Sequence, residues 1–593
     1  MALGAVIVLM SLIAAGIVLW RAQTRDRGRS PSMLELSRFT SYPGVETMPA
    51  FSPDGKEIAY VRAEHNPILL HLWRRQVGHA NIYTKLVGAA TELRLTNHPG
   101  ADYNPAWSPD GQYIAFYRDE RAASGLYVIS ALGGQERRIT TEQQAETAGI
   151  AWLPDGHHLL ISRFSEASRS SPLIEVSLDT GDQRPFTSPP TGTLGDAWPA
   201  ISPDRKNLAF LRFKDTDLVD ICFTPLSHEQ VQCRPLQGSW PQGLTWTASG
   251  DGIIVSAVRN LGYRLWRYDT KGSAPVALTL GEDNSVLPTL SPHGNQLAYV
   301  LSRENIDLWE LDVDSARPAN AADARRIASS SRLQSDPALS PDGSRIAFHS
   351  DRSGSQEIWV GDANPQTSTQ LTHFGGPPTG SPSWSPDGRQ IAFDSEQPEG
   401  TAIYLISPDG GIPRRITPNT GDNCVPSWSQ DGKFVYFASS RSGEFQIWKV
   451  PAATGETSTS PAIQVTRGGG FRAFESPDGK YLYYAKGRGK AGLWRRNLSD
   501  GKEEPVLGSL QQWGWWALGP GVIYFLELPD SLPRQVHLKE FDTAQHRVSE
   551  LATLTYPVQA ATPTLTTSRD GRHLVYTQID SMEADIMLAD NFR

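Results

Sequence analysis

A short motif of the type Trp-Ser-Pro-Asp-Gly recurs along this chain and limits what it can fold into. In its clearest copy, residues 107–118, one strand ends at Trp107, a Pro109-Asp110-Gly111 turn follows, and a second strand begins at Tyr113. Proline fixes φ in such a turn, and glycine tolerates positive φ. The residues after the turn alternate with the period of two that is typical of a strand. Because an isolated hairpin is marginal in water, we expect the copies to pack together.

The motif occurs in twelve copies, at spacings of about 42 to 56 residues, close to the period of a four-stranded propeller blade. Third and fourth strands are expected after each hairpin, for example at residues 126–129 and 137–140. The copies begin at Phe51, Trp107, Trp152, Ile201, Trp246, Leu290, Leu339, Trp384, Trp428, Glu475, Ala517 and Thr567. Since propellers have four to eight blades, we predict an all-β fold of two six-bladed β-propellers built from four-stranded antiparallel blades.

The N-terminus predicts a membrane anchor. Residues 1–20 carry no charged side chain and are long enough to cross a bilayer as a helix, and Trp20 with Arg21 fits an interfacial anchor. A cleaved signal peptide is the alternative, but no basic start precedes this stretch. The arginines at 21, 25, 27 and 29 follow the helix, so the positive-inside rule favours a cytoplasmic chain, although long domains translocate regardless of such charges.

The predicted domains follow from these features. They are a transmembrane helix at 1–20, a tether at 21–33, a first propeller at 34–314, a linker at 315–326 and a second propeller at 327–593. The linker lacks strand character and falls between the sixth and seventh repeats. The net charge of −9, without a long basic tract after Arg29, gives nucleic-acid binding little support.

Three cysteines bear on the compartment. Cys222 and Cys233 flank a predicted hairpin, whose turn would place them opposite each other, whereas Cys424 stands alone. Cys222 and Cys233 form either a disulfide, which requires an oxidising compartment, or two half-buried thiols. Three histidines between residues 63 and 80 invite a metal hypothesis, but no acidic or cysteine partner shares a familiar spacing with them, so a decorated surface loop is the preferred interpretation.

The repeated Trp-Ser-Pro-Asp-Gly-x-x-Ile-Ala-Phe pattern resembles the WD40-like PD40 repeat of the TolB β-propeller family over about residues 34–593. The opening, a membrane helix followed by residues 36–55, is similar to the sensor region of CadC-like winged-helix regulators, although no winged helix precedes it here. The resemblance implies a periplasmic module on a single-pass inner-membrane protein. It also implies a protein, peptide or small envelope ligand.

The axial channel of each propeller is the predicted binding site, because residues before each motif approach it. A ring of carboxylates there could bind a cation or a basic peptide, whereas polar side chains at a wet channel mouth are the simpler interpretation. The candidates are Glu46, Asp102, Asn104, Glu146, Asp196, Asp283, Asn284, Asp336, Asp422 and Asn423.

A catalytic function has little support in the sequence. A hydrolase domain of the prolyl-oligopeptidase type needs a Gly-x-Ser-x-Gly elbow, and none occurs; neither does His-Glu-x-x-His or Cys-x-x-Cys. We therefore predict a ligand-binding or sensing module that signals through self-association, with no cofactor, no catalytic residue and no metal site. An envelope scaffold similar to TolB and a channel-centred enzyme are the alternatives.

The way the rings close is a separate prediction. Each half ends one strand short and begins with a spare strand, at residues 36–40 and 325–329. Because an unpaired strand edge invites aggregation, each spare strand should complete a blade. In the independent-ring arrangement, residues 36–40 pair with 307–311, and residues 325–329 pair with 585–590. In the nested alternative, residues 36–40 pair with 585–590, and residues 325–329 complete repeat six.

Overall fold

The computed structural model describes most of the chain after residue 33. The described residues are 34–63, 79–120, 124–141, 149–162, 170–214, 218–227, 230–237, 241–258, 263–280, 284–313, 323–328, 332–362, 368–376, 378–396, 400–418, 421–452, 461–487, 492–527, 536–554 and 562–592. Within these ranges no helix is long and apolar enough to cross a membrane. The predicted transmembrane helix at 1–20, the tether at 21–33 and the loop that holds His65 and His71 lie outside them.

The predicted hairpin turn is confirmed in its clearest copy. The Ser108 hydroxyl donates to the Asp110 carboxylate over 2.6 Å and accepts the Tyr113 N–H over 2.9 Å. The Gly111 N–H closes the turn on the Ser108 carbonyl, and Gly111 has a φ of 74°. Serine and aspartate therefore hold the turn through their side chains, while glycine supplies the left-handed backbone.

The tryptophan of the motif joins one repeat to the one before it. The Trp107 indole N–H donates to the Ala50 carbonyl of the preceding repeat over 3.0 Å, and Trp152 donates to Ala106 over 2.8 Å. The same bond is repeated from Trp246 to Ala200, from Trp384 to Ala338 and from Trp428 to Ser383. Neighbouring repeats therefore pack sheet against sheet, and the indole N–H adds a hydrogen bond at the same place in five of them.

The described strands form four-stranded antiparallel groups, as predicted; eight are separate sheets, and the others are joined in a 14-stranded sheet. The first five groups contain β2 (Val45–Phe51), β3 (Glu57–Ala63), β4 (Ala80–Leu86), β5 (Glu92–Arg94); β6 (Ala101–Trp107), β7 (Tyr113–Asp119), β8 (Gly125–Ser130), β9 (Arg137–Arg138); β10 (Ile150–Trp152), β11 (His158–Ser162), β12 (Leu173–Ser177), β13 (Gln183–Pro185); β14 (Gly195–Ile201), β15 (Asn207–Phe213), β16 (Val219–Pro225), β17 (Gln232–Pro235); and β18 (Leu244–Trp246), β19 (Gly252–Val258), β20 (Tyr263–Asp269), β21 (Val276–Ala277).

Five further groups come from the second half of the chain. They contain β25 (Gln334–Leu339), β26 (Arg345–Ser350), β27 (Glu357–Asp362), β28 (Thr369–Gln370); β29 (Thr379–Trp384), β30 (Ile391–Ser395), β31 (Ala402–Ile406), β32 (Arg414–Arg415); β33 (Asn423–Trp428), β34 (Phe434–Ser439), β35 (Gln446–Pro451), β36 (Ile463–Gln464); β37 (Phe471–Glu475), β38 (Tyr481–Ala485), β39 (Leu493–Asn497), β40 (Glu503–Leu507); and β41 (Trp516–Leu518), β42 (Val522–Glu527), β43 (Val536–Asp542), β44 (Arg547–Leu554).

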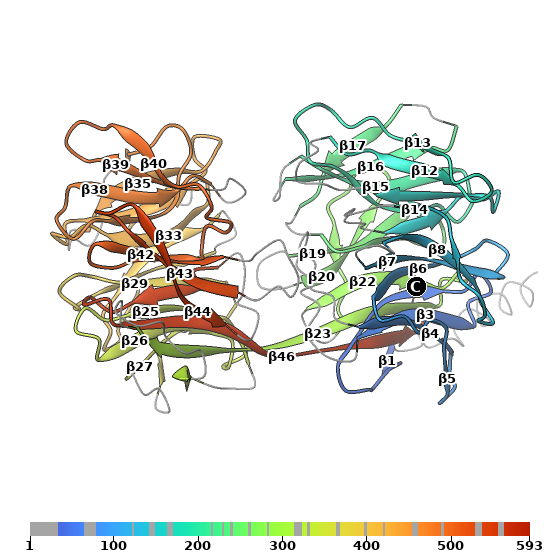
Figure 1. Cartoon of the computed structure of the whole chain (residues 1–593), viewed down its shortest axis with the longest axis horizontal. Helices are drawn as coiled ribbons and strands as arrows, with labels where there is room; N and C mark the ends of the chain where they lie inside the picture. Colours follow the sequence, from blue (N-terminus) through green and yellow to red (C-terminus); the bar gives the residue numbers. More distant parts are fainter. Residues whose placement is uncertain are drawn as a thin grey trace, which may run out of the picture.

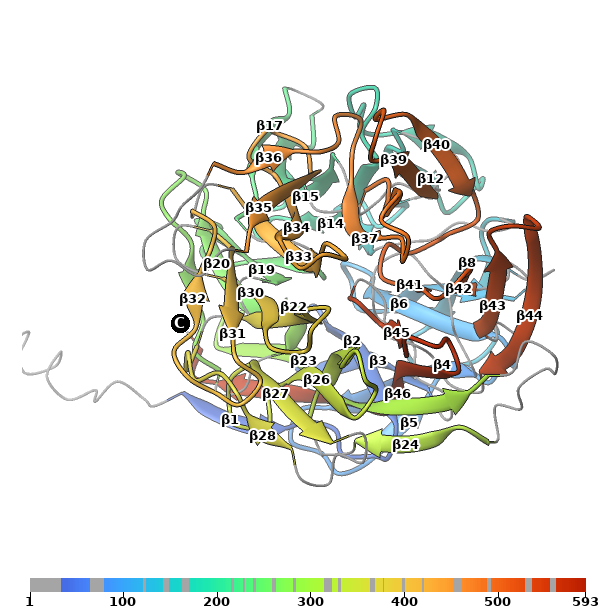
Figure 2. The same cartoon turned by 90° about the vertical axis from the view of Figure 1, so that its left-hand side faces the viewer.

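The groups are arranged in two rings that lie side by side (Figure 1). In the first ring, the innermost strands follow one another as β2, β6, β10, β14, β18 and β22 (Ser285–Leu290), and β22 contacts β2 again. In the second ring, which faces the viewer in Figure 2, the order is β25, β29, β33, β37, β41 and β45 (Leu565–Thr567). Contact between β45 and β25 closes this ring.

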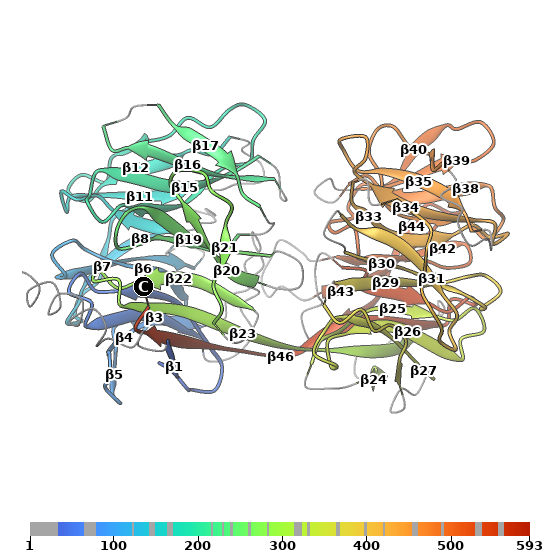
Figure 3. The same ribbon diagram turned by 180° about the vertical axis from the view of Figure 1, so that it is seen from behind.

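Two long strands run from one ring into the other (Figure 3). β23 (Gln296–Asp312) and β46 (His573–Asp590) pair antiparallel along their whole length, from Gln296 opposite Asp590 to Asp312 opposite His573. We call this pair the crossover ladder. The first ring is completed by β22, β23, β46 and β1 (Glu35–Arg38), and the second by β45, β46, β23 and β24 (Arg325–Ala328). Each ring therefore borrows a strand from the other half of the chain.

The independent-ring pairing predicted from sequence is wrong. Leu36 lies opposite Ala589, and Leu308 lies opposite Ala328, which is the pairing of the nested alternative. The physical reason is the absence of a turn: residues 296–312 and 573–590 contain neither glycine nor proline. Without a turn the chain does not reverse direction after the second strand of the sixth repeat. The same strand therefore continues into the other ring. Leu311 accordingly belongs to the apolar core of the second ring.

Candidate functional site

Three of the predicted carboxylates of the first ring form internal ion pairs. Glu46, Asp102 and Asp196 each contact an arginine sixteen residues later, directly opposite on the second strand of the same sheet. The Asp102 pair is bidentate, because Arg118 Nε lies 2.6 Å from Oδ1 and Nη2 lies 2.7 Å from Oδ2. Burial raises the pKa of Asp102, and Arg118 opposes that shift. These buried pairs hold two strands together, although Glu46 Oε2 has no hydrogen-bond partner among the described residues.

The remaining candidates are spread over different surroundings. Glu146 and Asp283 lie outside the described residues. Asn423 is buried, its amide donates to three backbone carbonyls, and its oxygen accepts from Arg441. Asp422 lies at the exposed end of the same segment. Asn104, Asn284 and Asp336 share a positive φ, and Asn104 and Asp336 occupy equivalent positions of their innermost strands.

That shared position is a β-bulge that recurs around both rings. Register shifts occur there in most innermost strands, and the residue at the bulge adopts the left-handed backbone. We call these the bulge residues: Met48, Asn104, Trp198 and Leu287 in the first ring, and Asp336, Ser381, Val425 and Arg472 in the second, with φ between 41° and 54°. Non-glycine residues rarely adopt this conformation, and such strain tends to cluster at functional sites.

The first ring surrounds its axis with mainly apolar bulge residues. Leu287 belongs to a large apolar core, and Met48 and Trp198 pack against it. Gly149 lies beside Trp198, and a Cβ atom at Gly149 would come within 3.2 Å of the Trp198 Cα. Glycine at position 149 therefore leaves room for Trp198, whose indole N–H has no hydrogen-bond partner among the described residues.

The second ring instead gathers ionisable side chains, which we call the axial cluster: Asp336, His349, Asp394 and Arg472. Asp336 Oδ2 lies 3.1 Å from His349 Nδ1 and accepts the backbone N–H of Ser381 over 3.0 Å. Asp394 Oδ2 accepts the backbone N–H of Val425 over 2.8 Å. The carboxylates thus bind the bulge of the next strand, which fixes their orientation.

Gly380 marks the point on which three of these groups converge. A Cβ atom at Gly380 would lie 3.2 Å from Asp336 Oδ2, 3.7 Å from His349 Nδ1 and 3.8 Å from Asp394 Oδ1. Asp336 and His349 are each only 5% exposed, whereas Asp394 is partly exposed. Neither ring nitrogen of His349 has a hydrogen bond of good geometry among the described residues. An unsatisfied buried imidazole nitrogen is costly, which indicates that this end of the cluster accepts a further partner.

Arg472 carries the positive charge of the cluster from the other side of the ring. It is 4% exposed, and its Nη atoms donate to the backbone carbonyls of Gly514 and Leu565, the latter over 2.9 Å. These carbonyls belong to the two repeats that follow, so the guanidinium reaches across them. Within the described ranges, no carboxylate oxygen lies within 4.0 Å of it. Buried arginines are usually paired, so this one lacks its ordinary counter-charge.

Burial shifts the ionisation of the cluster. Burial raises the pKa of Asp394 to about 6, and the charge of Asp336 acts in the same direction. Burial opposes protonation of His349, but the charges of nearby aspartates, Asp336 first, outweigh it and raise its pKa. Burial lowers the pKa of Arg472 to about 9, and Asp336 partly offsets this. Near neutral pH the cluster therefore holds charges of both signs.

Sequence reasoning found Asp336 but missed His349, Asp394 and Arg472. His349 and Asp394 occupy one position of the second strand, opposite Ser335 and Gly380. Other repeats place apolar residues at this position: Val61, Tyr117, Leu211, Val300 and Ala438. An ionisable residue at a position that is usually apolar was the available signal.

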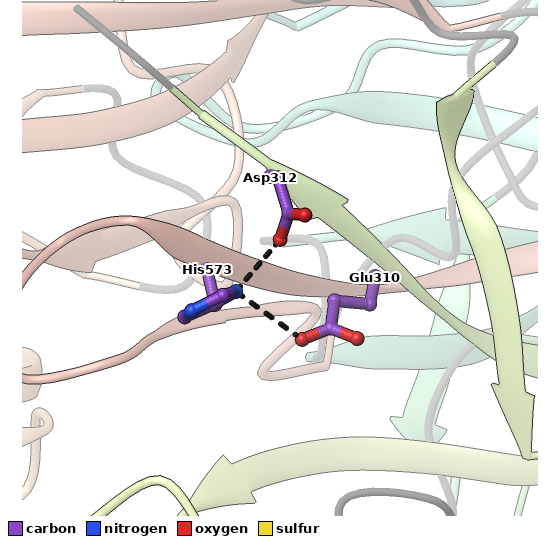
Figure 4. Close-up of side chains that lie close together, drawn as sticks. All are labelled: Glu310, Asp312 and His573. Atoms are coloured by element: carbon purple, nitrogen blue, oxygen red, sulfur yellow. Dashed lines mark hydrogen bonds and ion pairs between the residues drawn. The ribbon is translucent and has the colours of Figure 1, made fainter.

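Outside the cluster, the described residues contain one group with metal-ligand chemistry, Glu310, Asp312 and His573 (Figure 4). It lies on the crossover ladder, where His573 Nδ1 is 2.7 Å from Asp312 Oδ1 and 3.6 Å from Glu310 Oε1. Glu310 also pairs with Arg325. One imidazole and two carboxylates suit Zn²⁺, but Asp312 and His573 are well exposed, and ion pairing between facing strands already accounts for the contacts.

Two of the three cysteines lie on the outer strands of one sheet of the first ring. Cys222 on β16 and Cys233 on β17 face each other and form a disulfide. Arg212 Nη1 lies 3.8 Å from the Cys233 sulfur. Cys424, on β33 of the second ring, is partly buried. The bond joins two neighbouring strands at the edge of a sheet.

Comparison with known proteins identifies the repeat. The TolB beta propeller domain model (PD40) matches residues 32–224 and 253–411, and the Tricorn protease N-terminal beta propeller domain model matches 357–507. The chain is 38% identical over 156 residues to the Tol-Pal system protein TolB of Bordetella pertussis, which covers 26% of this chain and 34% of that protein. It is 35% identical over 117 residues to the uncharacterized peptidase YuxL of Bacillus subtilis, covering 20% of this chain and 17% of the peptidase.

Among solved structures, the chain is similar to TolB from Acinetobacter baumannii. The TM-score is 0.33, the sequence identity is 17%, and the alignment covers 62% of this chain and 79% of that one. The tricorn protease has a TM-score of 0.33 with 12% identity, and coverage is 90% of this chain and 61% of that one. The curated relatives are thus matched over about a third of their length or less. The family model, by contrast, spans more than half of this chain, so the protein belongs to the TolB beta propeller domain family.

Proposed function

We propose that this protein is a membrane-anchored binding module with two six-bladed propellers, and that the second ring binds the ligand at its axis. Residues 1–20 form the anchor, and the rings lie on the periplasmic side. The ligand is a protein, a peptide or a small envelope molecule. Binding is passed to the membrane helix through a change in self-association. The name of the Bordetella relative, a Tol-Pal system protein, agrees with a role in the envelope.

The difference between the two axes supports this proposal. Equivalent bulge residues are mainly apolar in the first ring, whereas the second ring places Asp336 and Arg472 there, with His349 and Asp394 beside them. Burying such charges costs stability. A ring that served only as scaffold could use the apolar solution that the same chain already contains, so the charged cluster is the single observation that carries the proposal.

Binding is favoured over catalysis by the way the carboxylates are held. Asp336 and Asp394 each accept a backbone N–H from the next innermost strand, which stabilises their charged form and fixes their position. A carboxylate that is held in place in its charged form is suited to bind a positively charged group of a ligand. The Bacillus relative is named a peptidase, but this chain matches only 17% of that protein, so no activity is carried over to this chain.

Site-specific photo-cross-linking in cells tests where the ligand binds. A photoreactive amino acid at position 373, an exposed residue in the segment between β28 and β29 of the second ring, should form adducts after illumination. Position 97 is its equivalent in the first ring, also exposed, and serves as the matched control. We expect adducts at 373 that disappear with Asp394→Asn, and few adducts at 97. Equal adducts at both positions, or adducts at 373 that persist in the variant, would contradict the proposal.

Thiol labelling tests the compartment. If the rings are periplasmic, alkylation of the unfolded native protein without reductant should label Cys424 and leave Cys222 and Cys233 unmodified, because they remain bonded. Labelling after reduction should reach all three. Complete labelling of Cys222 and Cys233 without reductant would place the first ring in a reducing compartment.

A further inference from the structure

The axial cluster separates its charges across the second ring. Around this ring the innermost strands follow one another as β25, β29, β33, β37, β41 and β45. Asp336 lies on β25 and Arg472 on β37, which are three places apart in either direction and therefore on opposite sides of the axis. Asp394, on β30 of the neighbouring sheet, lies on the Asp336 side, since it binds Val425 on β33.

Arg472 and Asp394 have no partner of opposite charge within 4.0 Å among the described residues, whereas Asp336 lies 3.1 Å from the His349 imidazole. Asp336 acts on Arg472 from a distance. The two hydrogen bonds of Arg472 use Nη1 and Nη2 once each, and a guanidinium has five N–H donors. On the acidic side, Asp394 is partly exposed, and His349 leaves a nitrogen without a hydrogen bond. A ligand could therefore meet an acidic group at one end and a basic group at the other.

We infer that the axis of the second ring binds a zwitterion, a small molecule or chain end that carries an ammonium group and a carboxylate. The ammonium lies toward Asp336 and Asp394, and the carboxylate lies toward Arg472. This inference rests on the proposed function, because it names the chemistry of the ligand for the same site. A zwitterion satisfies both sides at once, whereas a singly charged ligand leaves one buried charge without a partner, and that penalty creates selectivity.

The aromatic surroundings of Arg472 agree with a ligand carboxylate at this end. The guanidinium carbon lies 5.2 Å from the ring centre of Phe474 and 6.0 Å from that of Trp516. Trp516 is fully buried, and its indole N–H has no hydrogen-bond partner among the described residues. Arginine binds carboxylates in a planar, two-point geometry, and low local polarity strengthens such a bond.

Calorimetric titration of the full chain in detergent at neutral pH tests this inference. The probes are glycine, β-alanine, γ-aminobutyrate and glycylglycine, which are zwitterions of increasing charge separation. N-acetylglycine and glycinamide each keep only one charge. We expect at least one zwitterion to bind and both singly charged analogues to bind at least tenfold more weakly than that zwitterion. No binding by any zwitterion, or equal binding by either analogue, would overturn the inference.

Variants locate the binding and separate this inference from the proposed function. Arg472→Gln and the isosteric Asp394→Asn should each weaken zwitterion binding at least tenfold; Arg472→Lys keeps the charge if the glutamine variant does not fold. Asn104→Gly, at the equivalent bulge of the first ring, is the matched control and should bind normally. If no zwitterion binds but cross-linking at position 373 still depends on Asp394, the inference fails and the proposed function stands. If both fail, both are wrong.

Discussion

At the residue scale, Asp394 and Asp387 show how the surroundings of a carboxyl group determine its role. They belong to the same repeat. Burial raises the pKa of Asp394 to about 6, whereas the Ser385 hydroxyl and a backbone N–H lower the pKa of Asp387 in the turn. The recurring turn aspartate stabilises the fold in its charged form. Asp394 costs stability in that form, which is expected of a residue kept for binding.

Asp394→Asn should change how stability depends on pH. A carboxyl group whose pKa is raised in the folded state holds its proton there between about pH 4 and pH 6, when the unfolded chain has lost it, so its contribution falls as pH rises through this range. The variant should remove that fall and raise the free energy of unfolding at pH 7.5 by about 1–3 kcal/mol. Thermal unfolding between pH 4 and pH 8 measures this.

Asp387→Asn is the matched control, with the opposite sign. Its lowered pKa means that its contribution is present above about pH 4 and is lost as pH falls. This variant should therefore lower the melting temperature at pH 7.5 and have little effect near pH 3. An Asp394→Asn protein whose pH profile matches the wild type would show that Asp394 ionises normally.

The turn glycine gives a second prediction at this scale. Gly111 has a φ of 74°, and nothing lies closer than 3.7 Å to the position of a Cβ atom, so backbone strain alone opposes a side chain there. Gly111→Val should lower the free energy of unfolding by about 1–3 kcal/mol. In the fourth repeat Arg205 occupies the same position with a φ of 62°. Arg205→Gly should therefore stabilise, by about 1–2 kcal/mol. Equal melting temperatures for both variants and the wild type would contradict the turn assignment.

At the scale of single elements, the motif tryptophan bonds one repeat to the one before it in five of the twelve copies. An indole can donate to the preceding repeat while packing between two sheets, as Trp384 does to the Ala338 carbonyl over 2.9 Å. The first repeat has Phe51 at this position and lies next to the crossover ladder instead. Where tryptophan occurs, its ring packs between the sheets while its N–H finds a partner.

Trp384→Phe tests the value of this bond. The change keeps an aromatic ring and leaves the Ala338 carbonyl without its donor, so it should lower the free energy of unfolding by about 1–3 kcal/mol. Trp448→Phe is the control, because the Trp448 indole N–H has no hydrogen-bond partner in the described part of the chain. It should be clearly less destabilising. If the two substitutions lower the free energy of unfolding equally, packing rather than the hydrogen bond explains the tryptophan at this position of the motif.

The repeats were predictable from sequence because each hairpin depends only on neighbouring residues. The position of Asp336 at the axis followed from the same logic. The role of Asp102 did not, because its partner Arg118 lies opposite it only once the strand register is known. Arg472 was missed for a similar reason: its contacts with Gly514 and Leu565 depend on ring closure, which no local pattern encodes.

At the scale of the whole molecule, the crossover ladder makes the two rings one folding unit. Each ring contains a strand from the other half of the chain, and Leu311 and Ala589 each lie in the core of the ring that borrows them. Ion pairs along the ladder, such as Arg303 with Asp585, add to the backbone pairing. A fragment of residues 34–314 therefore lacks part of its final sheet, and we expect neither half to fold when produced alone.

A designed disulfide tests this exchange most directly. Arg38 lies opposite Met587, so Arg38→Cys with Met587→Cys, in a protein carrying Cys424→Ser, should oxidise to a bond between β1 and β46. A protease site placed between residues 315 and 322 then separates the two halves of the chain. With the strands exchanged, the cleaved, denatured protein should run as one band without reductant and as two with it. Two bands without reductant, together with a bond formed by Arg38→Cys and Trp309→Cys, would show that each ring closes on its own strands.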